Sequence, residues 1–234
     1  MPHTGVKLHL LRIWQTIRSA AFARHGHERA YAAIVLSGGY EEAGDHGRFH
    51  LGIGDVVLHE RFESHINRFL GSGATVFNLP LSDRYAFLPG RASIADPDLV
   101  IRIAEKNKTE AAELLLSTAT VQQTAFVDWP DELVAALMEN PSLSLSLWGA
   151  NRGLTPWAIS RGFMQVFGLS PSAYRARTRA RHAWKAIETS GEPLSQIAAH
   201  LGFADQSHMT RSVKQLTGVG PQAWRTAANR FKTQ

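Results

Sequence analysis

The sequence predicts two domains: an N-terminal antiparallel β barrel of the jelly-roll type with linker helices, and a C-terminal all-α domain with two helix-turn-helix motifs. Short β-prone runs separated by Gly, Asp and Ser turns occupy residues 1–95, and helix-forming residues dominate residues 96–128. Residues 129–234 have a helical pattern in which one unit occurs twice. At 234 residues the chain is long enough for two domains, each with its own core.

The barrel prediction rests on runs of β-branched, aromatic and aliphatic residues that recur at short spacing. Such a series of short strands is typical of an antiparallel barrel or jelly roll. The runs are VKLHLLRIW, AYAAIVLSGGY, GRFHLG, GDVVLHE, SHINRFL and ATVFNLPL.

The segment Pro97–Gln123 has helix-forming composition, with a break near Asn107-Lys108. Its leucine and isoleucine residues give apolar faces that would pack against the barrel. A linker is expected at Thr124–Trp129.

Two stretches of the C-terminal part carry the same residue types in the same order, fifty positions apart. They are SRGFMQVFGLSPSAYR (Ser160–Arg175) and TRSVKQLTGVGPQAWR (Thr210–Arg225). Because so many of the matched residues are not chemically interchangeable, we infer that one supersecondary unit is built twice. The identical pairs are Arg161 and Arg211, Gln165 and Gln215, Gly168 and Gly218, Pro171 and Pro221, Ala173 and Ala223, and Arg175 and Arg225.

Each copy predicts a helix-turn-helix. In the first, the apolar helix LSLSLWGA precedes a turn at Gly153, and Thr155-Pro156 supplies the N-cap and first residue of the next helix. In the second, SQIAAHL is followed by a turn at Gly202, and Asp205 caps the helix QSHMTRSVKQLT. Two helices joined by a short turn that contains Gly form the arrangement that reads the DNA major groove.

Helical geometry selects the residues that would face DNA, because apolar side chains at three- and four-residue steps face the core. Arginine binds guanine, and glutamine binds adenine, through two hydrogen bonds each. Free N–H groups at helix starts and nearby cations suit phosphate contacts. We expect base contacts from Pro156, Trp157, Ser160, Arg161, Gln206, Ser207, His208, Thr210 and Arg211. We expect phosphate contacts from Thr155, Gln165, Arg175, Lys214 and Arg225.

The stretch Pro171–Thr189 predicts one helix that joins the two motifs. At 1.5 Å per residue this helix would be about 28 Å long. Two recognition helices at that separation would enter major-groove segments about one turn apart, so that one chain could read both.

The positive charge of the chain is concentrated on the repeats. Residues 141–234 contain 12 Lys+Arg and 3 Asp+Glu, a net charge of +9, whereas residues 1–140 contain 13 and 17, a net charge of −4. Nucleic-acid binding requires such a basic excess on the binding segment. The alternative, a repeat that serves packing alone, does not predict this asymmetry.

The segment from about Asp131 to Arg225 resembles the DNA-binding domain of the AraC/XylS family of transcription regulators. The most specific part is IAAHLGFADQSHMTR (Ile197–Arg211), with a glycine, a proline and Arg225 at matching spacing after it. The resemblance implies a seven-helix domain, in which a long helix bridges two helix-turn-helix subdomains, and sequence-specific promoter binding. It also suggests that the apolar faces of Pro97–Gln123 form a dimer interface between two copies of the chain, which leaves this use open beside packing against the barrel. One departure is Val213, where the family commonly has Phe. The family's base-reading positions fall on Trp157, Ser160, Arg161, Gln206, Ser207, Thr210 and Arg211.

The N-terminal part resembles the cupin barrels that often serve as ligand-sensing domains in this family. GIGDVVLHERFESHIN (Gly52–Asn67) is similar to the second cupin motif, and His25-Gly26-His27 followed by Gly38 is similar to the first. The position of the usual cupin glutamate falls at or near Tyr31. The resemblance places four candidate metal or effector residues in the barrel mouth: His25, His27, His59 and His65.

Eight of the 11 histidines lie before residue 66. Neutral imidazoles at this density could bind Zn²⁺, Ni²⁺, Fe²⁺ or Mn²⁺. Three uses of the barrel are therefore open: a metal site, a metal-free pocket for a small molecule, and a role in assembly alone. His46 and His50 lie in an expected hairpin and are expected to be exposed.

Composition excludes several classes of protein. Zero cysteines exclude disulfides, thiolate zinc sites and thiol-based redox sensing. No apolar run approaches the about 20 residues that a bilayer-spanning helix needs, and the N-terminus has no signal-peptide pattern. We therefore expect a cytoplasmic protein that has no membrane partner.

Together these features predict a sequence-specific DNA-binding transcription regulator, not an enzyme, whose barrel senses a small molecule or metal and modulates promoter binding. The expected partners are promoter DNA, the effector, a second copy of the chain in a homodimer, and RNA polymerase. Two alternatives are a metal-dependent cupin enzyme fused to a DNA-binding module, and an architectural DNA-binding protein with a silent barrel. The sequence shows no second carboxylate placed for the acid–base chemistry of such an enzyme.

Overall fold

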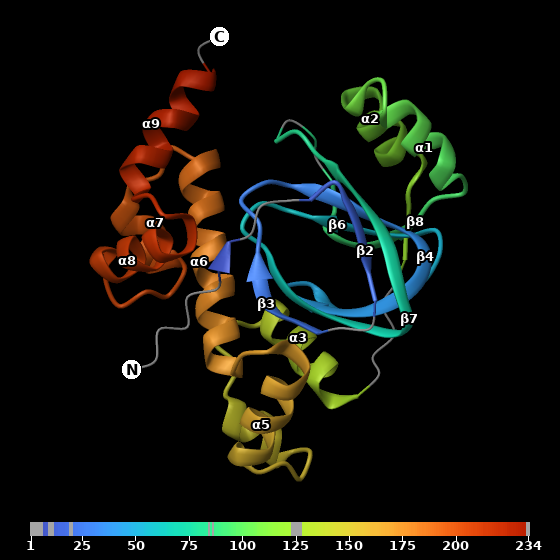
Figure 1. The fold of residues 1–234 in the computed structure, drawn as a ribbon. Coiled ribbons are helices and arrows are strands. Elements are labelled where there is room, and N and C mark those ends of the chain that lie inside the picture. The colour runs from blue at the N-terminus through green and yellow to red at the C-terminus, as the bar shows by residue number, and fades with distance from the viewer. Residues whose placement is uncertain are drawn as a thin grey trace. The chain divides into compact units, whose positions relative to one another are not determined.

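The computed structural model describes residues 7–8, 12–18, 21–83, 85, 87–122 and 128–232 (Figure 1). These residues fall into two compact units. Those within 6–135 and 161–168 form one, here called the sheet unit, and those within 136–160 and 169–234 form the other, the helical unit. The predicted domain boundaries after residues 95 and 128 stay predictions, and residues 124–127 of the expected linker lie outside the described residues.

The sheet unit is built on a nine-stranded sheet in which every described pairing is antiparallel except that of β1 with β3. Its strands follow the order β1-β3-β7-β4-β6-β8-β9, while β2 also pairs with β7 and β5 also pairs with β4. Among the described residues this path is open, so closure into a barrel stays a prediction. The strands are β1 (Lys7–Leu8), β2 (Trp14–Ile17), β3 (Ala21–Gly26), β4 (Tyr31–Gly44), β5 (Gly47–Leu51), β6 (Asp55–His59), β7 (Ser64–Pro80), β8 (Gly90–Ser93) and β9 (Thr120–Val121).

Strand β7 corrects one sequence prediction. The runs SHINRFL and ATVFNLPL, expected as two strands, form a single 17-residue strand. Gly71 and Gly73 lie between the runs with positive φ, which lets the chain bend without leaving the sheet. The strand β3, with the His25-Gly26 pair at its end, was not among the predicted runs. Of the run VKLHLLRIW, residues 9–11 lie outside the described residues.

Helices α1 (Pro97–Ala104) and α2 (Lys108–Thr118) pack on one face of this sheet. Ile34, Val56 and Leu79 from three neighbouring strands are fully buried in one cluster with Ala111 and Leu115 of α2. Removing this apolar surface from water stabilises the unit at about 25 cal/mol per Å². Packing of this segment on the sheet is therefore confirmed, whereas its use in a dimer stays a prediction.

Seven helices follow α2 in the described part of the chain, as the sequence predicts. They occupy the expected positions because caps and left-handed glycines set their ends. Gly153 and Gly202 form the turns inside the two motifs, and Gly168 and Gly218 end the second helix of each, all with φ between 67° and 78°. The helices are α3 (Trp129–Glu139), α4 (Leu145–Ala150), α5 (Pro156–Phe167), α6 (Pro171–Thr189), α7 (Leu194–His200), α8 (Gln206–Thr217) and α9 (Pro221–Lys232).

The close backbone contact at Gly38 predicts that a side chain there would destabilise the sheet. A Cβ atom there would lie 1.9 Å from the carbonyl oxygen of Gly73, and the φ of Gly38 is +68°. We expect Gly38→Ala to lower the free energy of unfolding by more than about 2 kcal/mol, measured by urea denaturation. The matched control is Gly71→Ala, which has φ of +59° but open space around it, and should cost only about 1 kcal/mol. Equal losses in the two variants would contradict the steric argument.

Candidate DNA interface and buried histidine pocket

Helix α5 presents the first predicted recognition face. Thr155 Oγ1 accepts a hydrogen bond from Ala158 N (3.2 Å), which caps the helix as expected. Ile159, Phe163 and Phe167 are buried, with at most 3% of their surface exposed. The four predicted base-reading residues of this helix are therefore on its outer side, and all are exposed: Pro156, Trp157, Ser160 and Arg161.

Helix α8 repeats the arrangement in the second motif. Asp205 Oδ1 accepts a hydrogen bond from His208 N (2.6 Å), which is the predicted cap. Met209, Val213 and Leu216 are buried, so the departure from Phe at Val213 is accommodated in the core. The remaining predicted base-reading residues lie outward: Gln206, Ser207, His208 and Arg211 are exposed and Thr210 is half-buried.

The matched arginines Arg175 and Arg225 have a second role that the repeat alone does not reveal. Arg175 Nη2 donates to the carbonyl oxygen of Leu143 (2.6 Å), just before α4. Arg225 Nη2 donates to the carbonyl oxygen of Glu192 (2.5 Å), just before α7. Each arginine therefore ties the helix after its recognition helix to the segment that leads into the same motif. Thr155, Gln165 and Lys214, the other expected phosphate-contacting residues, are exposed.

Replacing either arginine with Ala should destabilise the helical unit, because a carbonyl oxygen loses its charged donor. We expect a fall of about 1–3 kcal/mol in the free energy of unfolding, measured by urea denaturation. Lys214→Ala, at an exposed position, should change it by no more than about 0.5 kcal/mol. If Arg175→Ala and Lys214→Ala proved equally stable and lost DNA affinity equally, phosphate contact would be the main role of both side chains.

The sheet unit brings the four candidate histidines together. His25 on β3 pairs in register with His65 on β7, and Tyr31 on β4 pairs with His59 on β6. Residues directly opposite each other on paired strands point to the same face. The imidazole rings of His25 and His65 are 4.5 Å apart between centroids, and those of His59 and His65 are 4.8 Å apart. All four histidines are at most 8% exposed.

Glu42 completes this cluster and was missed at the sequence level. It lies on β4, buried to 2% exposure, and its Oε1 is 3.4 Å from His59 Nε2. Tyr31, which occupies the position of the expected carboxylate, stacks on His59 at 4.4 Å instead. Glu42 lies on the same face as Gly44, two residues along β4, which pairs with His65, but this register between distant strands cannot be read from the sequence.

Hydrogen bonds fix the orientation of these rings. The Nδ1 of His25 contacts the carbonyl oxygen of Ala23 at 3.0 Å, and its Nε2 lies 3.1 Å from His65 Nε2. The Nδ1 of His59 lies 3.2 Å from Glu63 Oε2, and the other oxygen of Glu63 is 2.7 Å from His46 Nε2. His46 is thus half-buried rather than exposed, whereas His50 is exposed as expected.

Burial and charge shift the pKa values of this cluster in different directions. Burial raises the pKa of Glu42 to about 7, although His59 and Arg24 oppose the shift. Burial opposes protonation of His59, but the Glu42 and Glu63 carboxylates outweigh it and raise its pKa. Burial and then the neighbouring histidines lower the pKa of His65 well below its usual value. His65 is therefore neutral at physiological pH, the state in which an imidazole binds a metal.

The hollow beside the cluster is small. It has a volume of about 30 Å³ and is lined by His25, His27, Tyr31, Glu42 and His65, with neighbouring residues of β4 and β7. One water molecule needs about 10–15 Å³ measured in this way. The pocket in this conformation therefore suits a water-sized or ionic ligand better than a larger organic molecule.

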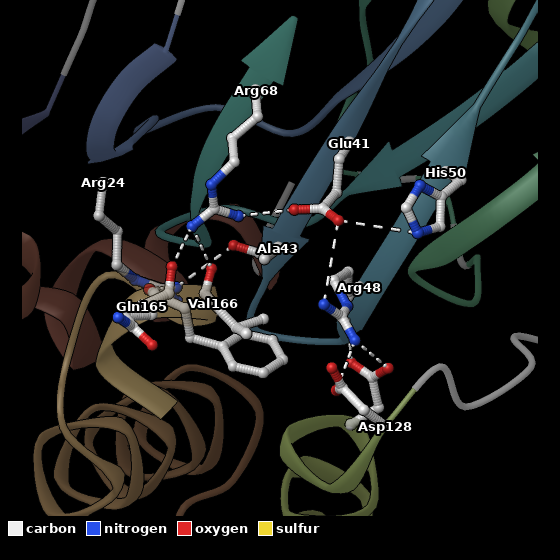
Figure 2. Close-up of polar contacts among 11 residues, drawn as sticks. Arg24, Glu41, Ala43, Arg48, His50, Arg68, Asp128, Gln165 and Val166 are labelled. Carbon is white, nitrogen blue, oxygen red and sulfur yellow. Dashed lines mark hydrogen bonds and ion pairs between the residues drawn. The ribbon is translucent and has the colours of Figure 1, made fainter. Parts of the chain in front are cut away.

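Arginines of the sheet hold the last turn of α5, whose residues 161–168 belong to the sheet unit (Figure 2). Arg68 donates to the carbonyl oxygens of Gln165 and Val166, the latter at 2.8 Å. Arg24 donates to the carbonyl oxygen of Phe167 at 2.8 Å. The last carbonyls of a helix have no partner within it and carry partial negative charge, so cationic donors stabilise them.

A second set of ion pairs continues this network. Glu41 accepts a hydrogen bond from Arg68 (2.7 Å) and lies 3.9 Å from Arg48 (Figure 2). Arg48 in turn binds Asp128 at 2.6 Å and Asp131 at 2.7 Å, where α3 begins. Within the sheet unit, Arg48 of β5 thus contacts the start of α3, Arg68 of β7 contacts the end of α5, and Glu41 of β4 lies between the two arginines.

The C-terminal part of the chain is similar to known proteins. Residues 148–227 match the family of the helix-turn-helix domain. The arabinose operon regulatory protein of Escherichia coli (strain K12) is 31% identical over 72 residues, which cover 31% of this chain but about a quarter (25%) of that protein's length. The multiple antibiotic resistance protein MarA of the same organism is 29% identical over 110 residues, covering 47% of this chain and 82% of MarA. The structure of ToxT from Vibrio cholerae is 10% identical with a TM-score of 0.43, covering 92% of this chain and 98% of that one.

No helix in the described part of the chain combines the length and the apolar character that crossing a membrane would need.

Proposed function

We propose that this protein is a regulator of the AraC/XylS type, which binds promoter DNA through α5 and α8 of its helix-turn-helix domain and responds to a ligand of its sheet unit. The observation that carries the DNA-binding role is the repeated recognition face. Each of the two helices buries its apolar side and exposes an arginine one turn or more after its cap, on a segment with a net charge of +9. Exposed arginines on basic recognition helices are the usual readers of guanine in the major groove.

The spacing of the two faces supports one continuous binding site. The α6 helix that joins the motifs has 19 residues, about 28 Å at 1.5 Å per residue. This length is close to one turn of B-DNA, 34–36 Å. We therefore infer that one chain reads two short blocks of sequence about one helical turn apart.

Selection of bound sequences from random duplex DNA by the full-length protein tests this function. We expect one motif with two blocks separated by about one turn. Arg161→Ala should relax base preference in one block and Arg211→Ala in the other, each costing about 1–3 kcal/mol of binding free energy. The control is Lys214→Ala, an expected phosphate contact, which should weaken all sequences about equally. Failure of the wild-type protein to enrich any motif would refute sequence-specific regulation.

The sensing role is supported by the positions of the pocket residues, which are neighbours in sequence of residues in the arginine network that holds α5. On three strands a pocket residue is adjacent in sequence to a residue of that network. Since successive side chains point to opposite faces, a shift of one strand moves both. The pairs are Arg24 and His25 on β3, Glu41 and Glu42 on β4, and Asn67 and Arg68 on β7.

An effector in the pocket would thereby change how residues 161–168 of α5 are held. For this to regulate DNA binding, the effector must prefer one arrangement over the other, with a coupling free energy of typically about 1–3 kcal/mol. The enzymatic alternative is less well supported, because a pocket of about 30 Å³ leaves little room for an organic substrate. The homodimer and RNA polymerase stay predicted partners.

Removing Arg68 should loosen the last turn of α5. In Arg68→Ala we expect faster amide hydrogen exchange in residues 161–168, because two carbonyl oxygens of that turn lose their charged donor. The matched control is Arg91→Ala, which breaks an ion pair with Asp55 (2.9 Å) elsewhere in the sheet. Unchanged exchange in residues 161–168 of Arg68→Ala would remove the proposed connection between sheet and recognition helix.

A further inference from the structure

We propose that Glu42, His59 and His65 form a binding site for one divalent transition-metal ion. The three side chains come from β4, β6 and β7, and β4 is hydrogen-bonded to both of the other strands. One potential ligand atom of each lies within 4.8 Å of the others, and all three residues are buried. This inference rests on the proposed sensing role and says which class of ligand the sheet unit binds. It can be tested without DNA.

Two ring nitrogens without a hydrogen bond identify this trio within the larger cluster. Among the buried imidazole nitrogens that the structure describes, His59 Nε2 and His65 Nδ1 have no hydrogen-bond partner, and His59 Nε2 lies 3.4 Å from Glu42 Oε1. Such atoms are rare in folded proteins and destabilise them unless a water or an ion supplies the missing contact. Both belong to the same trio, and the third member offers a buried carboxylate. A metal ion would satisfy the two nitrogens and balance the carboxylate charge at once.

The surroundings of His59 are those of a metal ligand. Its Nδ1 faces the Glu63 carboxylate at 3.2 Å, which favours a proton on Nδ1 and leaves Nε2, 3.4 Å from Glu42 Oε1, as the nitrogen that would bind the ion. Glu63 is itself held by His46 at 2.7 Å. A carboxylate that orients a histidine from behind is the usual second partner of metal-bound imidazoles, and it raises the basicity of the ligand.

The contacts of His25 favour Nδ1 as the ligand atom of His65. His25 Nδ1 donates to the Ala23 carbonyl oxygen, so its Nε2 carries a lone pair. That lone pair accepts the Nε2–H of His65 at 3.1 Å, which leaves Nδ1 of His65 unprotonated and free to bind an ion. His25 thus orients His65, whereas His27 has no part in the site that we propose.

The three ligand atoms limit which metal ions the site can bind. Two imidazole nitrogens and one carboxylate oxygen suit Zn²⁺, Fe²⁺, Ni²⁺ and Mn²⁺, whereas Mg²⁺ and Ca²⁺ prefer ligand sets made of oxygen alone. The adjoining hollow of about 30 Å³ leaves room for a water molecule as a further ligand.

Zinc binding to the full-length protein tests the proposal. Protein stripped with a chelator is titrated with Zn²⁺ in a calorimeter, and the metal content after gel filtration is measured by mass spectrometry. We expect one ion per chain and a rise in Tm with Zn²⁺ but not with Mg²⁺. Glu42→Gln and His59→Gln should each weaken Zn²⁺ binding at least about 100-fold, since each removes a direct ligand. His50→Gln, at an exposed histidine, should leave affinity unchanged.

His27→Gln separates this site from the neighbouring triad of His25, His27 and His65, which could also hold an ion. Retention of Zn²⁺ by His27→Gln supports the proposed ligands. Loss of Zn²⁺ in His27→Gln with retention in Glu42→Gln would overturn them, and so would a wild-type protein without stoichiometric metal. Circular dichroism of the chelated variants checks folding, and if Glu42→Gln does not fold, His59→Gln decides. Because none of these measurements involves DNA, their failure leaves the promoter-binding proposal intact.

Discussion

Side-chain alternation along β4 and β7 is the constraint on which the sheet unit depends. Strand β4 is hydrogen-bonded to β7 along one edge and to β6 and β5 along the other, so its register is fixed from both sides. A slip of one residue would place either Ala43 or Glu41 where Glu42 stands. In the first case the histidine cluster loses its carboxylate, and in the second Tyr40 takes the place of Glu41 and Arg68 loses its carboxylate acceptor. The chemistry of both faces is therefore fixed by one hydrogen-bonded ladder.

The helical unit contains α8 and the start of α5, and it must stabilise these helices without covering their polar sides. Each recognition helix has a narrow buried stripe, and its polar side is left for a ligand. Stability must then come from elsewhere in each motif. The arginine–carbonyl contacts of Arg175 and Arg225 supply part of it, at positions that the duplication preserves. A residue that is identical in both copies can thus stabilise the motif as well as contribute to its binding surface.

The sequence predicted the helical unit well because its signals are local. Caps such as Asp205 and glycines such as Gly218 act within a few residues of the helix ends that they determine. The sheet was predicted less completely, because pairing between distant strands leaves little trace in a local pattern. That is why the single strand β7 was predicted as two and why Glu42 was missed. The arginines that hold α5 could not be found at all, since Arg68 lies 97 residues from Gln165.

The close approach of β2, β4 and β7 also limits how this sequence can change. A side chain at Gly38 would collide with the backbone of Gly73, and one at Gly73 would collide with the carbonyl oxygen of Ile17, 1.9 Å away in each case. Three neighbouring backbones thus approach one another with no side chain between them. A larger residue at either glycine becomes acceptable only after the neighbouring strand has moved, so the order in which substitutions arise matters here. Each glycine should therefore change only after other substitutions have shifted the strand beside it, which makes the two positions epistatic.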